Sequence, residues 1–306
     1  MSRASVVAML VAAEILIVGM AVAAVGRGHA SIAGGLHHLD FSAVPVAPIA
    51  AGAAPHVVVD DVDSRVGVTP SSDDQVHVRD LTEIRGAVFS STKYPQLKVT
   101  RTLDGVRIER PHVGNLSIDI FGFSTQAIQV EVPAGARLEI ARCAGADVDG
   151  IAGGVNVHSL DGHVTLANLQ GSVDAESDDG YVKATNVHGD HLAIESRDGH
   201  LTLEQIAVAS LTGTTRDGRI EADDLNVTGN GTLQTDDGSV RARFTPDTNL
   251  TIDASTRDGQ ISVDGDSADR GDSGQRTIRL GTGAGTMKLA SGDGSIHIFT
   301  HGVIQQ

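Results

Sequence analysis

Hydrophobic and polar residues alternate with a period of two along most of the chain after residue 55. Typical pairs of apolar residues are Val66 with Val68 and Val106 with Ile108. Side chains of a β-strand point alternately to its two faces, so each such run predicts a short strand with one buried face. No stretch after residue 27 has sustained helical spacing. The pattern therefore predicts an all-β fold.

A four-residue motif, in which Ser or Thr is followed by any residue, Asp and Gly, recurs seven times in the second half of the chain. Its copies occupy residues 159–162, 177–180, 196–199, 215–218, 235–238, 256–259 and 291–294. Subtracting successive glycine positions gives intervals of 18, 19, 19, 20, 21 and 35 residues. One repeat of about 19 residues indicates a solenoid. The long last interval predicts a loop insertion at about residues 264–285.

Each motif is followed by a short apolar alternation, such as Leu201 and Leu203, and most repeats contain a second one. Two strands and two turns then form one rung of a β-solenoid of the β-helix or β-roll type. Leu203 should point inward and Thr202 outward, next to rungs around Ala184 and Ala222. Asp-Gly pairs are also typical of hairpins, so a hairpin meander is the alternative. The recurrence of one face pattern favours stacking, because a single rung cannot fold alone.

The Asp-Gly pair of each motif predicts the geometry of the turn. Glycine adopts positive φ at little cost, and the Asp carboxylate can accept backbone N–H groups of its own turn. Stacked rungs lie about 4.8 Å apart, so these carboxylates could instead align as ligands of calcium. Turn capping is the expected role, and a calcium ladder is the alternative. The aspartates concerned are Asp161, Asp179, Asp198, Asp217, Asp237 and Asp258.

The position after each motif glycine forms an outward column of mixed chemistry, which suits a contact surface better than a reaction. The residues of this column are His163, Tyr181, His200, Arg219, Ser239, Gln260 and Ser295.

The N-terminus predicts a membrane anchor. Residues 4–26 are apolar apart from Ser5 and Glu14, and a helix of that length can cross a hydrocarbon layer about 30 Å thick. Arg3 favours a cytoplasmic N-terminus, which places the repeats in the periplasm or outside the cell. A cleaved signal peptide is the alternative, since Ala21-Val22-Ala23 has small residues at cleavage spacing.

Four segments follow from these patterns. Residues 1–27 form the transmembrane helix or signal segment, and residues 28–55 form a flexible linker rich in Ala, Gly and Pro. Residues 56–142 form a β-strand region that caps the solenoid, and residues 143–306 form the solenoid repeats.

Composition limits the classes of function. The net charge of −16 disfavours binding to nucleic acid. Aromatic residues are 3% of the chain, with no Trp, so the core must consist of Val, Ile, Leu and Ala, and stacking on sugar rings is disfavoured. Cys143 is the single cysteine, which excludes an intramolecular disulfide and a multi-cysteine zinc site. We expect Cys143 to be buried.

Three short motifs with functional counterparts are interpreted as loops. Arg270-Gly271-Asp272 matches an integrin-type tripeptide, and the overlapping Gly271-Asp272-Ser273-Gly274 matches a serine-protease loop. Both lie in the predicted insertion, in polar surroundings. The glycine-rich residues 281–285 lack the spacing and the helix of a nucleotide site, which indicates a return loop to the solenoid. The sequence therefore predicts no catalytic residue and no cofactor.

The strand order resembles that of a bacterial family. His56-Val57-Val58-Val59 comes first, then residues 130–138 (VEVPAGARL), then the serial motifs. Across about residues 56–300 this is similar to bacterial β-strand-repeat proteins that are provisionally named adhesins, a domain family of unknown function. The resemblance implies an envelope protein, a right-handed solenoid and no established activity.

Together these features predict a non-catalytic adhesion, scaffold or binding module of the cell envelope. Its expected partner is an envelope protein or polysaccharide, and the N-terminal helix would hold it at the membrane. A membrane-tethered regulatory sensor of envelope state is the first alternative. A carbohydrate-active enzyme on a β-helix is the second.

Overall fold

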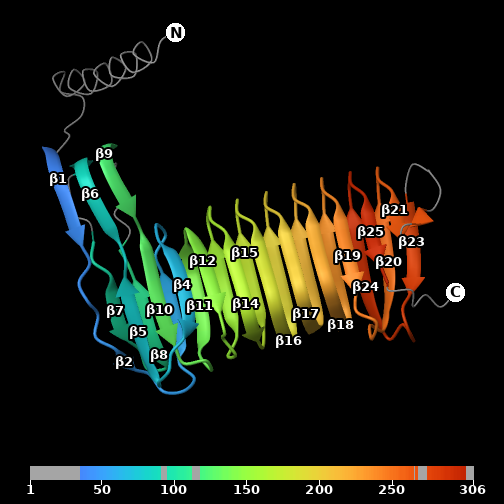
Figure 1. Ribbon diagram of the computed structural model, residues 1–306, viewed down its shortest axis with the longest axis horizontal. Coiled ribbons are helices and arrows are strands. Elements are labelled where there is room, and N and C mark those ends of the chain that lie inside the picture. Colours follow the sequence, from blue (N-terminus) through green and yellow to red (C-terminus); the bar gives the residue numbers. More distant parts are fainter. Residues whose placement is uncertain (1–34, 91–94, 112–117, 265, 268–273, 301–306) are drawn as a thin grey trace, which may run out of the picture. The chain divides into compact units, whose positions relative to one another are not determined.

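The computed structural model describes residues 35–90, 95–111, 118–264, 266–267 and 274–300. These residues divide into two compact units (Figure 1). Every regular element among them is a β-strand, which confirms the predicted all-β fold. None of the described residues belongs to a helix that is long and apolar enough to span a membrane. The predicted membrane segment, residues 1–27, lies outside the described residues.

The first unit contains a three-stranded sheet with the order β1 (Gly35–Ser42), β6 (Glu83–Ser90) and β9 (Ile118–Thr125). Strand β1 and the two-residue strand β2 (Ile49–Ala50) fall within residues 28–55, which the sequence predicted to be a flexible linker. That segment therefore contains more regular structure than its composition indicated.

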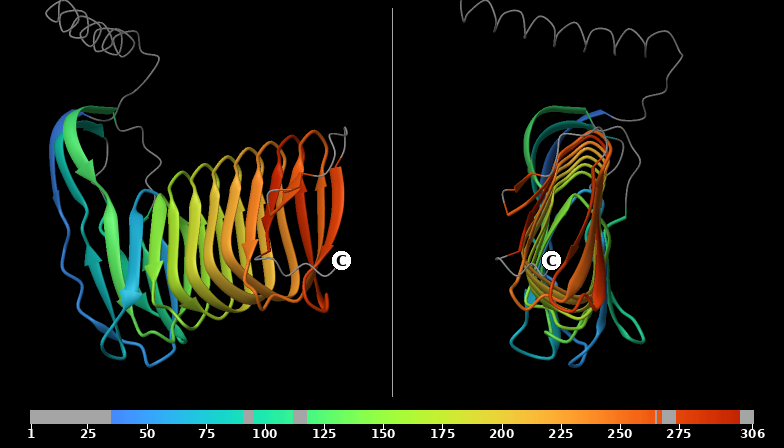
Figure 2. Two further views of the ribbon diagram at one scale, coloured as in Figure 1. Left: turned by 45° about the vertical axis from the view of Figure 1, so that its right-hand side comes forward. Right: turned by 90° about the vertical axis from the view of Figure 1, so that its right-hand side faces the viewer.

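The second unit is a stack of rungs whose strands form two sheet faces (Figures 1 and 2). The first face has the order β7 (Lys98–Arg101), β8 (Gly105–Glu109), β3 (His56–Asp60), β11 (Arg137–Cys143), β13 (Val155–Ser159), β15 (Val173–Ser177), the C-terminal halves of β16 (Val182–Ser196), β17 (Leu201–Thr215) and β18 (Ile220–Thr235), then β24 (Gly285–Ser291), β20 (Leu250–Thr256) and β23 (Gly274–Arg279).

The second face has the order β2, β5 (Gln75–Asp80), β10 (Ala127–Val132), β4 (Arg65–Pro70), β12 (Gly145–Asp149), β14 (Val164–Gln170), the N-terminal halves of β16, β17 and β18, then β19 (Val240–Phe244), β25 (Ile296–Phe299), β21 (Ile261–Val263) and β22 (Asp266–Ser267). Neighbouring strands within the stack are parallel, and the pairs at its ends, such as β7–β8 and β20–β23, are antiparallel.

Parallel pairing in constant register confirms the predicted stack and contradicts the hairpin meander. Leu203 lies opposite Ala184 on one side and Ala222 on the other, as predicted. Leu203 is buried, whereas Thr202 is partly exposed. The right-hand view of Figure 2 looks along the stack, and successive rungs superpose.

The core consists of aliphatic side chains in rows that run along the stack. One fully or almost fully buried row contains Val164, Val182, Leu201, Ile220, Val240, Ile296 and Ile261. Neighbouring rungs cover these residues on both sides, so each rung depends on its neighbours for burial. Cys143 is part of the same core and is fully buried, as predicted.

The order of the rungs at the C-terminal end differs from the order in the sequence. Strands β24 and β25 lie between the rung of β18 and β19 and the rung of β20 and β21. The last repeat of the sequence is therefore inserted between two earlier ones. Strands β22 and β23, from the long interval between the last two motifs, pair with the end of the stack instead.

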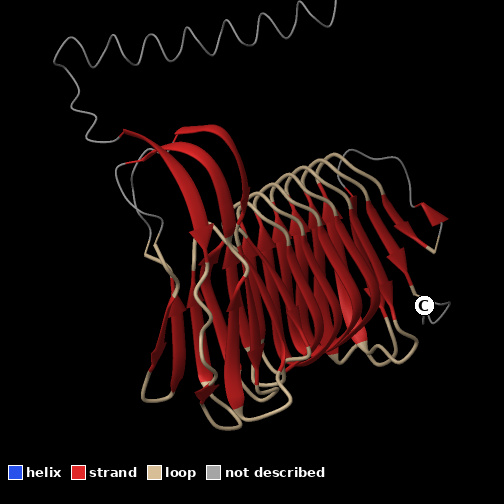
Figure 3. Cartoon of the chain, turned by 60° about the vertical axis from the view of Figure 1, so that its left-hand side comes forward, coloured by secondary structure: helices blue, strands red, loops and turns tan. Residues whose placement is uncertain are grey.

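Close backbone approach, and not positive φ, explains the motif glycines. None of the seven has a φ in the left-handed region, which occurs at other corners, as at Asn186 and Gln205 (both φ 56°). A Cβ on Gly199 would collide with the carbonyl oxygen of Gly180, and one on Gly218 would collide with that of Gly199. The turns stack backbone against backbone, and their loops follow one another in rows (Figure 3).

In the four motifs that begin with Ser, the hydroxyl group, and not the Asp carboxylate, caps the turn. Gly199 N–H donates to Ser196 Oγ (3.0 Å), and Ser196 Oγ donates to the carbonyl oxygen of Gly180 in the preceding rung (2.9 Å). We call this series the hydroxyl ladder. Its members, all buried, are Ser159, Ser177, Ser196, Thr215, Thr235, Ser291 and Thr256. From Ser177 onward, each hydroxyl of the ladder donates to a glycine carbonyl oxygen of the neighbouring rung and so links the two turns.

Candidate functional site

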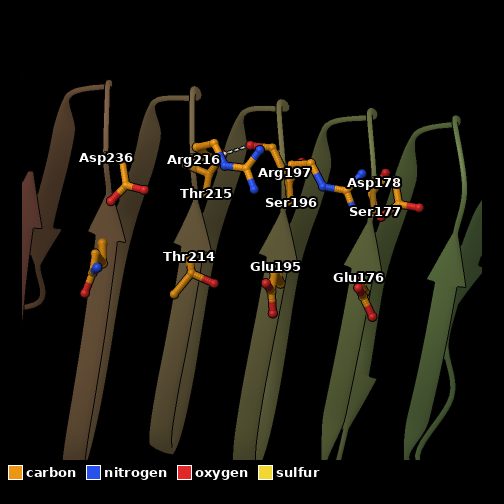
Figure 4. A pocket seen from close by; sticks show the side chains of 11 residues that line it. Glu176, Ser177, Asp178, Glu195, Ser196, Arg197, Thr214, Thr215, Arg216 and Asp236 are labelled. Atoms are coloured by element: carbon orange, nitrogen blue, oxygen red, sulfur yellow. Dashed lines mark hydrogen bonds and ion pairs between the residues drawn. The ribbon is translucent and has the colours of Figure 1, made fainter. Parts of the chain in front are cut away.

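An open groove crosses four successive rungs beside the motif turns (Figure 4). Its lining residues are Glu176, Ser177, Asp178, Glu195, Ser196, Arg197, Thr214, Thr215, Arg216, Gln234 and Asp236. Its volume of about 240 Å³ is below the roughly 300–1,000 Å³ of typical small-molecule pockets. The groove therefore has room for a side chain or another small group.

Strand register positions the side chains along the floor of the groove. Glu176 lies opposite Glu195, Glu195 opposite Thr214, and Thr214 opposite Gln234. Each of these residues immediately precedes a motif Ser or Thr, whose side chain points into the core. Because side chains alternate along a strand, the preceding residue must point outward. The row is therefore held in place by the core beneath it.

The groove carries more negative than positive charge. Its carboxylates come from Glu176, Asp178, Glu195 and Asp236, and its guanidinium groups come from Arg197 and Arg216. Arg197 Nη2 donates to Asp178 Oδ1 at 2.8 Å. Within the described part of the chain, Glu176 and Glu195 form no ion pair, although they occupy adjacent positions. Neighbouring like charges repel each other, so the groove favours a positively charged partner.

The hydroxyl groups of the groove are not arranged for nucleophilic attack. Ser177 Oγ donates to Gly162 O (3.0 Å), Ser196 Oγ to Gly180 O, and Thr215 Oγ1 to Gly199 O (2.8 Å). A nucleophilic hydroxyl needs an adjacent general base to accept its proton. These protons are held by backbone carbonyl oxygens, so the hydroxyls serve the fold.

The six aspartates for which a calcium ladder was the alternative lie at the exposed corner of the motif turns. Asp161, Asp179, Asp198, Asp217, Asp237 and Asp258 are all exposed. In the described structure none of these carboxylates hydrogen bonds to its own turn, so the predicted capping role is wrong: the Ser hydroxyls of the ladder make such bonds. The calcium ladder stays an alternative that the structure does not test.

The outward column after the motif glycines is exposed at its N-terminal positions. The rings of His163 and Tyr181 stack with centroids 4.0 Å apart and an angle of 18° between their planes. His200 Nδ1 accepts a hydrogen bond from the backbone N–H of Arg219 (3.3 Å). The column thus has the exposure that a contact surface requires.

Of the three loop motifs interpreted from the sequence, the structure describes one in full. Residues 281–284 form a turn between β23 and β24, in which Gly281 and Gly283 have φ values of 55° and 70°, and Gly285 begins β24, as expected for a return loop. Arg270-Gly271-Asp272 and most of Gly271-Asp272-Ser273-Gly274 lie outside the described residues.

A buried cluster of charged residues connects turns of the first rungs. Arg110 Nε donates to Asp61 Oδ2 (2.7 Å), and Arg110 Nη2 donates to Asp80 Oδ2 (2.9 Å). The three side chains are each 2% exposed. Desolvation lowers the pKa of Arg110, but its hydrogen bonds to Asp61 and then Asp80 outweigh this and raise it. The paired charges link separate turns and have a structural role.

Sequence reasoning missed the floor of the groove, because it followed the constant positions of the motif. The signal was one residue upstream, where His158, Glu176, Glu195, Thr214 and Gln234 place a polar side chain before each hydroxyl. Alignment of the repeats on the glycine reveals this row. Arg110 had no comparable signal, since its partners come from distant turns.

The fold and the groove define a parallel β-solenoid with a polar surface beside its turns. The family model described as Toastrack DUF4097 matches residues 55–300, and the chain belongs to this family, a domain of unknown function. This agrees with the family that the sequence resembles.

Two solved structures are similar to the chain. One is a protein from Bacteroides fragilis provisionally named an adhesin, with a TM-score of 0.41 and 13% identity over 86% of this chain and 97% of that one. The other is a provisionally named cell adhesion protein from Clostridium sporogenes, with a TM-score of 0.25 and 9% identity over 87% and 99%. At these values neither likeness bears on function. No protein of curated function matches the sequence.

Proposed function

We propose that the chain is a non-catalytic binding module outside the cytoplasm, whose groove contacts a basic segment of an envelope protein. The observation that carries this proposal is the row Glu176, Glu195, Thr214 and Gln234, which the parallel register holds at a fixed spacing on a rigid core. A surface whose backbone is already fixed loses less entropy on binding than a flexible segment does.

Two features favour binding over catalysis at this groove. Its Ser and Thr hydroxyls are engaged with backbone carbonyl oxygens, and its volume suits single side chains. The excess of carboxylates supports a protein partner with Lys or Arg side chains. A polysaccharide is a weaker fit, because no aromatic ring lines the groove. Tethering through residues 1–27 belongs to the same proposal and rests on the sequence.

Site-specific photo-crosslinking in living cells tests this function. A photoreactive residue at Thr214 should crosslink to one envelope protein, since Thr214 lies in the groove. The matched control is Thr202, a partly exposed residue of the same strand, β17, that does not line the groove. Crosslinking at Thr214 should disappear when Glu195 is changed to Lys. Equal crosslinking at both positions, or a polysaccharide adduct at Thr214, would contradict the proposed function.

The non-catalytic part is tested separately. Full-length protein incubated with envelope polysaccharide should release no reducing ends. Release that stops with Asp198→Asn would show a carbohydrate-active enzyme instead.

A further inference from the structure

Three metal-ligating side chains converge at one end of the groove. His158 lies on β13, Glu176 on β15, and Asp178 in the turn after β15. A ring nitrogen of His158 and one carboxylate oxygen of each acidic residue all lie within 4.8 Å of one another. Since His158 is directly opposite Glu176 in the parallel register, the stacking of two rungs brings these groups together.

A second, independent observation concerns the imidazole. Nε2 of His158 is buried and has no hydrogen-bond partner, and it is the single side-chain nitrogen or oxygen atom of this kind among the described residues. Buried polar atoms in folded proteins almost always have a partner. A neutral imidazole is also a common metal ligand. The ring of His158 therefore has a nitrogen atom that is available to a ligand.

The donor set distinguishes between classes of cation. Zinc and related ions bind nitrogen and carboxylate oxygen at about 2.0–2.2 Å, which places tetrahedral ligands about 3.3–3.6 Å apart. The three donor atoms lie within 4.8 Å of one another, so the side chains must draw together to bind such an ion, and the exposed Glu176 side chain is free to rotate. Calcium takes six to eight oxygen ligands, which this site does not offer. Arg197 holds Oδ1 of Asp178 at 2.8 Å, so it orients the carboxylate in the way that outer-shell groups orient metal ligands.

We propose that His158, Glu176 and Asp178 bind a divalent transition-metal ion of the zinc type. The three side chains leave coordination positions for water or for a side chain of a bound partner. Glu176 and Asp178 also line the groove, so the ion reduces the excess negative charge at that end. The site goes beyond the proposed binding function and does not depend on it.

Calorimetric titration of the full-length, chelator-treated protein with ZnCl2 tests the site. We expect one high-affinity zinc ion per chain and at least tenfold weaker binding in Glu176→Gln. The matched control is Glu195→Gln, because Glu195 is the next residue of the same row, is also exposed and lies one rung further along. Its zinc affinity should equal that of the unchanged protein.

His158→Gln should abolish the same binding event, with circular dichroism to establish that the β structure is retained. Since His158 is partly buried, Glu176→Gln keeps the test valid if the histidine variant does not fold. Equal zinc affinity in Glu176→Gln, Glu195→Gln and the unchanged protein would overturn the proposal. Competition by CaCl2 at a similar concentration would overturn the assignment to a zinc-type ion.

Discussion

Thr256 donates its hydroxyl hydrogen to the carbonyl oxygen of Gly294, with 2.8 Å between the two oxygen atoms. Every other step of the hydroxyl ladder from Ser177 onward connects a rung to one that precedes it in the sequence, whereas this step connects it to a later one. Ser291 in turn donates to Gly238 (2.7 Å). The last repeat is therefore clamped on both sides by earlier ones, and its insertion completes the ladder.

The motif glycines should tolerate no side chain. Gly218→Ala places a Cβ against the carbonyl oxygen of Gly199, and because that oxygen belongs to the backbone, two rungs must move apart. We expect destabilisation by about 2–3 kcal/mol, as for overpacking in a core. Denaturant unfolding followed by circular dichroism measures the change.

The matched control is Gly67→Ala in β4, where the new Cβ would meet the flexible end of the Gln129 side chain. This change should alter the free energy of unfolding by less than about 1 kcal/mol. Similar losses in both variants would mean that close backbone stacking does not explain the motif glycine.

The register of the rung that contains Leu203 predicts very different costs for changes at two adjacent residues. Leu203→Asp should destabilise by more than about 3 kcal/mol, because it removes buried apolar surface and introduces a buried carboxylate without a partner. Thr202→Asp should cost less than about 1 kcal/mol, as surface changes usually do. Hydrogen exchange should show that the damage from Leu203→Asp spreads to the rungs of Ala184 and Ala222, its neighbours in the stack. Loss of protection confined to one rung would contradict this.

Cys143 should be unreactive in the folded protein. Desolvation raises the pKa of its thiol to about 11, and the side chain is fully buried, so the thiolate that alkylating reagents attack is absent at pH 8. Iodoacetamide should modify the thiol only as fast as the protein unfolds. Complete modification within minutes under native conditions would contradict the predicted burial.

The same pKa determines the effect of this thiol on stability at high pH. The unfolded thiol, with its usual pKa of about 8.5, loses its proton before the folded one does. The contribution of Cys143 to stability is therefore constant at neutral pH and falls as the pH rises from about 9 toward 11. Cys143→Ala should remove this part of the pH dependence.

Local sequence patterns predicted the strands, the repeat length and the direction of side chains such as Leu203, because each depends on neighbouring residues. The insertion of the last repeat has no such signature. Met287 and Leu289 continue the same buried rows as Ile252 and Ala254, so either repeat could occupy either position by its pattern alone. Only contacts between distant residues distinguish the two orders.

The candidate site was harder to predict for a related reason. The Asp that is constant in the motif indicated a site at the exposed corner of the motif turns. The residues that converge are instead at variable positions, such as His158 and Asp178, and they meet only when two rungs are superposed. Burial of Arg110 likewise depends on turns that are far apart in the sequence.

Parallel stacking of the rungs brings together the residues of the groove and the metal ligands. The inserted rung is the feature of this stack that the order of the repeats in the sequence does not predict. Cysteine pairs test it in a Cys143→Ser background. Asn230 lies opposite Thr286, and Thr286 lies opposite Thr251. Adjacent strands are about 4.8 Å apart, which suits a disulfide, whereas Asn230 and Thr251 are two strand spacings apart, about 9.6 Å, beyond disulfide reach.

Air oxidation of the folded protein, read by mass spectrometry, gives the answer. Cysteines at positions 230 and 286 should form a disulfide in high yield, and cysteines at positions 230 and 251 should not. A disulfide between 230 and 251, with none between 230 and 286, would place the rungs in sequence order and contradict the inserted rung.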